Sequence, residues 1–178
     1  MYRKITVAVI VTMLTLIIII FATGSMCLDT SSTVAQSVFA QSQQKFTAKL
    51  TGKEEVPPTN TTATGIAQFV QSADGKVLNY KVSAMNINGV TEGNIQQGKA
   101  GEIGPTIVRL FKFNTPTLLL KNATLSEGNI TSKGLRGPLS GSQISDLVKI
   151  IKDGNAYVNI HTIKNFDGEI RGQLSLSP

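Results

Sequence analysis

The sequence contains one cysteine and one histidine in 178 residues, and both scarcities narrow what the protein can be. Because Cys27 has no second cysteine to pair with, no intramolecular disulfide can form, and the fold has to be stabilised by its core. His161 supplies the only imidazole, and a single imidazole does not make a strong zinc or copper site. Disulfide-stabilised scaffolds and metal sites with several histidines are therefore excluded.

Motifs of several common enzyme classes are missing as well. The sequence has no Gly-x-Ser-x-Gly motif, which would carry a nucleophilic serine. Glu54 and Glu55 are adjacent, so on an extended chain they point to opposite faces and do not form the carboxylate pair of a glycosidase. The segment Gly98–Gly104 is rich in glycine but lacks the Gly-Lys-Ser/Thr ending of a phosphate-binding loop. We expect no catalytic residues, no enzymatic activity and no bound cofactor.

The basic residues are not clustered. The chain carries a formal net charge of +6, but its lysines and arginines are scattered and are not interleaved with aromatic residues. Nucleic-acid binding usually needs a basic patch, so nucleic acid is not an expected partner. A mildly basic domain would instead be suited to an acidic cell surface.

A long apolar run near the N-terminus is the clearest targeting signal. Residues 5–22 are apolar apart from three threonines, and they follow Arg3 and Lys4. As a helix this run would be ~27 Å long, close to the hydrocarbon thickness of a bilayer. Residues 1–24 are therefore predicted to be a signal peptide or an N-terminal membrane anchor. The rest of the chain is expected to be extracellular or at the cell surface, and tethered by residues 5–22 if the leader is not cleaved.

The remaining chain divides by composition. Residues 25–44 are polar and predict a disordered linker, whereas residues 45–178 have the size of one domain. This domain has short alternating runs separated by turn signals such as Asp74-Gly75, and only residues 142–152 have helical spacing. We predict an all-β fold, an antiparallel β-sandwich with one short helix. The runs expected to form strands are 46–50, 65–70, 77–82, 106–111, 129–131, 157–162 and 168–174.

Six short motifs occur in a characteristic order along this domain. They are Phe46–Gly52, Glu55-Val56-Pro57-Pro58, Thr62–Gly65, Gly98–Pro105, Tyr157–Thr162 and Gly168–Gln173. In this order they make the chain resemble the chordin (CHRD) domain family over residues 46–174. The resemblance implies an extracellular, immunoglobulin-like β-sandwich of poorly known molecular function, found in exported microbial proteins. The signalling role of animal chordin is not implied, because the resemblance covers the module and not its partner.

The chain departs from the family at two positions. The resemblance implies a His-x-His pair where this sequence has Asn94 and Gln96. With His161 from a neighbouring strand, such a pair would supply three nitrogen ligands for zinc or copper, as in a dismutase-like sandwich. Here two of the three are carboxamides, which are poor ligands, so we expect no metal site. A metal-binding, dismutase-like protein is the least favoured alternative.

The candidate functional residues lie on these strands. The side chains of Asn94, Gln96 and His161 are expected to form a hydrogen-bonded polar cluster between strands. Alternatively, they line a strand face that binds a small ligand or a glycan. Two charged residues near the C-terminus lie two apart on one strand and are expected to make cross-strand ion pairs of little energetic value. Together these candidates are Asn94, Gln96, Asn159, His161, Glu169 and Arg171.

Three Asn-x-Ser/Thr triplets, at Asn60, Asn122 and Asn129, are possible N-glycosylation sites on an exported domain. From the sequence we therefore expect a non-enzymatic, structural, adhesive or protein-interaction module. Its partner would be an unknown protein or glycan at the cell surface. A glycan binder that uses the strand face around His161 is the main alternative.

Overall fold

The computed structural model describes residues 43–119 and 123–178. The predicted leader (1–24), nearly all of the predicted linker (25–44) and Asn122 lie outside the described residues. Among the described residues, no helix is long and apolar enough to cross a membrane.

The described residues form nine strands, one α-helix and three short 3-10 turns. In chain order these are β1 (Lys45–Thr51), η1 (Gly52–Glu54), β2 (Thr64–Gln71), β3 (Leu78–Met85), β4 (Ile87–Gln97), β5 (Thr106–Leu119), β6 (Ala123–Ile130), η2 (Ser132–Gly134), η3 (Gly137–Leu139), α2 (Ile144–Lys152), β7 (Ala156–Thr162), β8 (Ile170–Gln173) and β9 (Ser175–Leu176).

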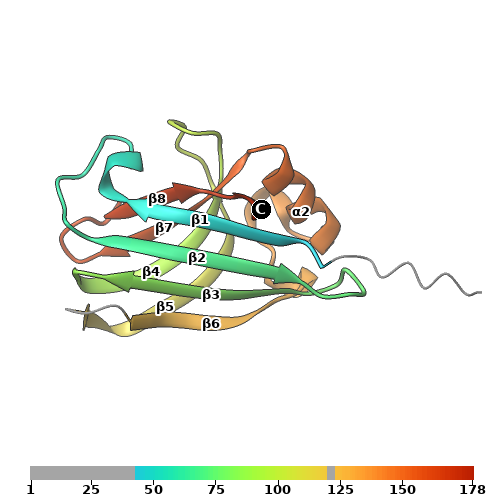
Figure 1. Ribbon diagram of the computed structural model, residues 1–178, viewed down its shortest axis with the longest axis horizontal. Helices are drawn as coiled ribbons and strands as arrows, with labels where there is room; N and C mark the ends of the chain where they lie inside the picture. Colours follow the sequence, from blue (N-terminus) through green and yellow to red (C-terminus); the bar gives the residue numbers. More distant parts are fainter. Residues whose placement is uncertain (1–42, 120–122) are drawn as a thin grey trace, which may run out of the picture. The chain divides into compact units, whose positions relative to one another are not determined.

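The strands form one curled antiparallel sheet (Figure 1). Its hydrogen-bonded order is β5-β4-β7-β8-β1-β2-β3-β6, and β9 pairs with β1. The prediction of a mostly β, antiparallel fold with one helix is thus confirmed. Hydrogen bonds join all the strands into a single nearly barrel-shaped sheet, so the division into the two stacked sheets of an immunoglobulin-like sandwich remains a prediction.

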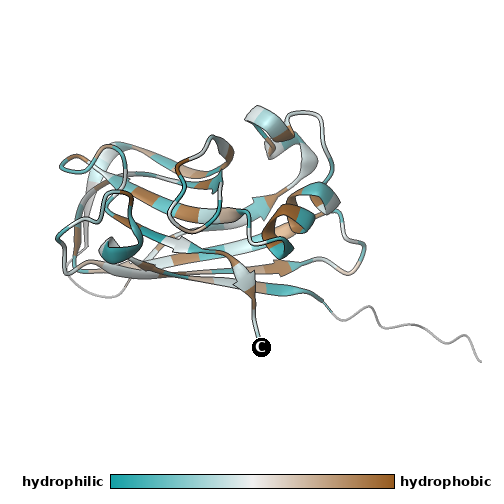
Figure 2. Ribbon diagram, turned by 90° about the horizontal axis from the view of Figure 1, so that it is seen from above, coloured by the Kyte–Doolittle hydropathy of each residue, from teal (hydrophilic) through white to brown (hydrophobic). Residues whose placement is uncertain are grey.

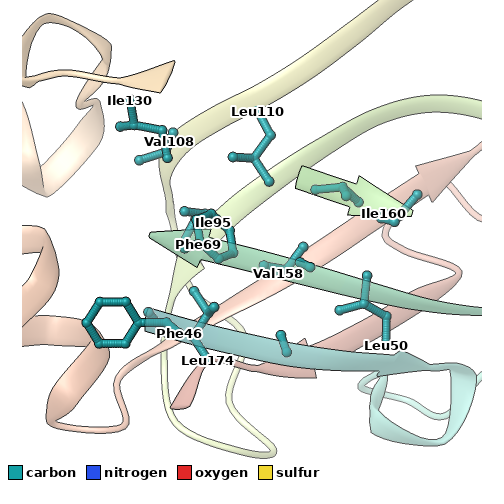
Figure 3. Packing of buried hydrophobic residues seen from close by; sticks show 14 of the residues in the cluster. Phe46, Leu50, Phe69, Ile95, Val108, Leu110, Ile130, Val158, Ile160 and Leu174 are labelled. Atoms are coloured by element: carbon teal, nitrogen blue, oxygen red, sulfur yellow. The ribbon is translucent and has the colours of Figure 1, made fainter. Parts of the chain in front are cut away.

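The alternation of apolar and polar residues decides which face of the sheet is buried (Figure 2). On β1, Phe46 and Leu50 are at most 1 % exposed, whereas Lys45 and Lys49 lie outside. Figure 3 shows the inward side chains of β1, β2, β4 and β7 gathered in one core. Each fully buried side chain of this size contributes roughly 1.5–3 kcal/mol, which is how a chain without a disulfide is stabilised.

Two local predictions can be compared directly with the structure. The Asp74-Gly75 turn joins β2 to β3 as expected, with Gly75 at a φ of 72°. The helix expected over residues 142–152 spans Ile144–Lys152. The backbone N–H of Gln143 donates to Asp146 Oδ2 at 2.8 Å, so Gln143 is the N-cap.

Candidate functional site

A row of polar side chains crosses the outer face of β4, β7 and β8. Asn94 pairs with Asn159, and Asn159 pairs with Arg171. All three are about 3 % exposed, although their neighbours along each strand, such as Val158, already fill the core on the opposite face. Other parts of the chain must therefore shield this outer face from solvent. The loop between β4 and β5 and the turn between β7 and β8 do so.

The loop between β4 and β5, residues 98–105, lies over one part of this face. Arg171 Nη2 donates to the Lys99 carbonyl at 3.0 Å, and the Gly104 N–H donates to the Tyr157 hydroxyl at 3.1 Å. The Arg171 guanidinium also lies 3.3 Å from the centre of the Tyr157 ring, a cation–π contact. The glycine-rich segment Gly98–Gly104 is thus part of a loop between strands that is hydrogen-bonded to the sheet.

The turn between β7 and β8, residues 163–168, also lies over this face. His161 forms a hydrogen bond to the backbone of this turn. His161 Nδ1 lies 2.7 Å from the Phe166 carbonyl oxygen. Because a carbonyl oxygen only accepts, His161 Nδ1 is the donor in this contact. Asn159 Nδ2 donates to the Asp167 carbonyl at 2.9 Å and to Gln96 Oε1 at 3.2 Å. The lone histidine is therefore a structural hydrogen-bonding residue that fixes the backbone of this turn.

Replacing His161 with Gln is expected to remove the bond to the Phe166 carbonyl. The free energy of unfolding should fall by about 1–2 kcal/mol, the cost of a buried hydrogen bond. Urea denaturation of the wild type, His161→Gln and the exposed control Lys164→Gln would measure this. Zinc and copper should stay at background in all three purified proteins. Stoichiometric metal in the wild type that is lost on substitution would contradict the structural role.

Glu169 joins the same turn to the loop between β1 and β2. Its carboxylate accepts hydrogen bonds from Thr61 at 2.8 Å, Thr162 at 2.8 Å and Asn165 at 3.1 Å. The expectation that Glu169 and Arg171 make cross-strand ion pairs of little energetic value is wrong. Both are more than nine-tenths buried, and within the described residues neither forms a salt bridge. The loops that fold over them, which strand pairing alone does not reveal, remove both groups from solvent.

Glu55 is a buried residue of this site that sequence reasoning missed. Its Oε1 and the Oδ1 of Asn159 have no hydrogen-bond partner within the described parts of the chain. Both atoms lie under Gly168, at 2.5 and 2.4 Å from the position that a Cβ there would occupy. A protonated Glu55 carboxyl can donate to the Asn159 oxygen. The only sequence signal was the place of Glu55 directly before Val56-Pro57-Pro58.

The environment of Glu55 favours this protonated form. Burial raises the pKa of Glu55 from 4.5 to about 7, against the opposing effects of the Arg171 charge and of a hydrogen bond from the Val56 N–H. Three of the sequence motifs therefore meet at one point: the motif that begins at Glu55, the motif that contains Asn159 and the motif that begins at Gly168. Their occurrence together in the sequence has a common structural reason.

The family pattern implied that positions 94, 96 and 161 lie together, and in this chain they do not. Gln96 pairs with Tyr157, whereas His161 pairs with Glu92. Gln96 and His161 are thus four residues apart along the sheet, ~13 Å at the strand rise. No group of three His, Cys, Asp or Glu side chains suited to a metal occurs in the described part of the chain. The geometry inferred from the family pattern was therefore wrong for positions 94, 96 and 161.

The loop between β1 and β2 and the turn between β7 and β8 lie at the same end of the sheet (Figure 1, left end). Their residues line an open hollow. It measures about 460 Å³ and lies between residues 55–60 and 164–168. Phe166 is 75 % exposed and Ile163 is 51 % exposed on the same turn. Nothing in the sequence indicated that these two loops lie side by side.

Two of the possible glycosylation sites can be located. Asn60 and Asn129 are exposed, as N-glycosylation requires, and Asn60 lies at the rim of the hollow. Asn122 is outside the described residues. Glycosylation at all three stays a prediction.

The structure is thus that of an antiparallel β module. Loops hydrogen-bonded to its polar strand face shield that face from solvent. Comparison with protein-family models shows that the CHRD domain model matches residues 46–174. The chain therefore belongs to the CHRD domain family, and the resemblance seen in the sequence is confirmed. No curated protein matches the chain.

Proposed function

We propose that this CHRD-domain protein is a non-enzymatic binding module of the cell surface, exported by its N-terminal apolar segment. The segment 5–22 anchors it to the membrane if it is not cleaved. The turn 163–168 and the loop 55–60 form its binding end. Family membership supports an interaction module, and the basic flank before the apolar run supports export.

One observation carries the proposal: a surface turn that exposes a phenylalanine is held in place by buried polar groups. His161, Asn159 and Glu169 all fix its backbone or side chains, yet Phe166 itself remains 75 % exposed. A loop that is already ordered loses little conformational entropy when a partner binds. An exposed aromatic side chain on such a loop is a typical anchor for recognition.

The strand face around His161, which the sequence suggested as a ligand-binding surface, supports the binding end from beneath. His161 is 8 % exposed and its Nε2 is buried. Its contribution to recognition would therefore be to position the turn above it. A partner would contact Phe166 and the two loops.

The proposal is tested on intact cells by placing a photo-crosslinking amino acid at position 166 of the full-length protein. A matched control carries it at Ile103, which is 73 % exposed on the loop between β4 and β5. We expect crosslinks to surface components from position 166 and far fewer from position 103. Protease added to the intact cells should destroy the domain, because it is expected to be outside.

Full protection of the domain inside sealed cells would overturn the export. Equal crosslinking from positions 103 and 166 would overturn the assignment of the binding end, since it would indicate contact by general proximity to the surface.

A further inference from the structure

We propose that the hollow between residues 55–60 and 164–168 is a binding site for a neutral oligosaccharide, with Phe166 as the surface on which a sugar ring lies. This inference rests on the proposed binding function and names the class of ligand. A sugar ring has an apolar C–H face and a rim of hydroxyl groups, so its site needs an exposed aromatic surface beside polar side chains. The hollow combines both.

The apolar part of the hollow is rigid. Pro57 and Pro58 form part of its lining, and their rings fix the backbone φ angle. Phe166 lies across from this loop on a turn whose backbone is fixed by His161 and Asn159. Ligand binding would therefore not require either wall to become ordered first.

The polar part offers hydrogen-bonding groups of the kind that hydroxyls use. Asn60, Asn165 and Asp167 line the hollow. The Asn165 side chain already donates its Nδ2 to Glu169 at 3.1 Å, which orients its Oδ1 as an acceptor. An acceptor held in this way can bind a hydroxyl without first losing rotational freedom.

The charges favour a neutral ligand. Lys164 and Asp167 lie in the same lining and carry opposite charges, and the Glu55 carboxyl is buried beneath Gly168. No cluster of one sign is available to bind a phosphate, a sulfate or a polyamine. The size of about 460 Å³ lies within the ~300–1,000 Å³ of small-ligand sites and suits the end of an oligosaccharide.

A hydrophobic peptide fits this surface less well. On the loop 55–60 and the turn 163–168, the exposed large apolar side chains are Phe166 and Ile163. A peptide that binds through its apolar side chains usually needs a longer groove with several pockets. One aromatic ring beside amides and a carboxylate is better suited to a single sugar ring.

The test uses the full-length protein made in a host without N-glycosylation, so that Asn60 carries no glycan of its own. Chitotriose, mannotriose, cellotriose and maltotriose are titrated separately, and binding is followed by calorimetry and by amide chemical shifts. At least one of these neutral sugars should bind and shift the amides of residues 55–60 and 164–168. Phe166→Ala should weaken that binding about tenfold or more, and Ile103→Ala should leave it unchanged.

His161→Gln tests the positioning role, because it touches no ligand. It should weaken binding of the same sugar while the remaining shifts still map to the same two loops. No shift from any neutral sugar, shifts confined to other loops, or equal binding by Phe166→Ala would overturn the inference. If position 166 still crosslinks to surface proteins on cells while no sugar binds, the glycan assignment fails and the proposed binding function stands.

Discussion

Gly168→Ala should destabilise the protein by roughly 3–5 kcal/mol, among the largest effects of any substitution near the site. A Cβ at this position would lie 2.4 Å from Asn159 Oδ1 and 2.5 Å from Glu55 Oε1. Both atoms belong to buried side chains, so neither can move into solvent without breaking the polar layer. The φ of 141° at Gly168 adds backbone strain for any residue with a Cβ. Urea denaturation would measure the loss.

Gly101→Ala and Gly141→Ala separate the steric effect from backbone strain. Their φ angles are 82° and 83°, and a Cβ at either position would have no atom within 4 Å. Each control should cost only about 1–2 kcal/mol, from the left-handed backbone alone. If Gly168→Ala costs no more than these controls, the close approach of Glu55 and Asn159 is not what requires glycine there.

Coupling between the two positions provides a further check. Removing the Glu55 side chain opens the space that the new methyl group would enter. Glu55→Ala and Gly168→Ala should therefore be less than additive in the double variant. Additive losses would show that the two positions do not share this space.

Glu55→Gln should stabilise the protein above neutral pH and change little near pH 5. The pKa of Glu55 is raised from 4.5 to about 7 by burial, so the folded state favours the protonated carboxyl. As the pH rises from 4.5 to 7, the unfolded state loses this proton first, and the free energy of unfolding falls. At pH 8 the variant should be ~2–3 kcal/mol more stable than the wild type, because Gln stays neutral and can still donate to Asn159.

The comparison is made by urea denaturation of both proteins at several pH values between 5 and 8. Arg171 on β8 acts on this carboxyl, and Lys164 and Asp167 line the same hollow. His161 on β7 and Glu169 before β8 belong to the same polar site. The free energies of unfolding of the wild type and the variant are subtracted at each pH. This largely cancels the pH dependence that the other groups contribute to both proteins. Glu54→Gln is the matched control, because Glu54 is adjacent and exposed. A difference between wild type and Glu55→Gln that does not grow with pH would refute the buried proton.

The amino-acid sequence was sufficient to predict the family and the class of fold. The strict alternation on β1 and the Asp74-Gly75 turn are local signals, and each specifies its strand or hairpin without reference to distant residues. The order of six motifs pointed to the CHRD family, which the match over residues 46–174 confirms. His161 was also expected to be a hydrogen-bonding residue, and the contact with the Phe166 carbonyl agrees with that role.

The site itself was decided by tertiary structure. Nothing in the sequence around Glu55 indicates that its carboxyl lies under Gly168 together with the side chain of Asn159, which is 104 residues further along the chain than Glu55. Register decided that Glu92, and not Gln96, lies opposite His161. A shift of four residues along a strand, like any even shift, leaves a pattern with period two unchanged. Burial of Glu169 and Arg171 depends on loops from elsewhere in the chain. The sequence by itself determined the family and most of the strands, because those signals are local, although β4 (Ile87–Gln97) and most of β6 (Ala123–Ile130) were not among the runs expected to form strands. Only the folded chain decided which polar groups are buried and which aromatic is exposed, because both depend on contacts between distant segments.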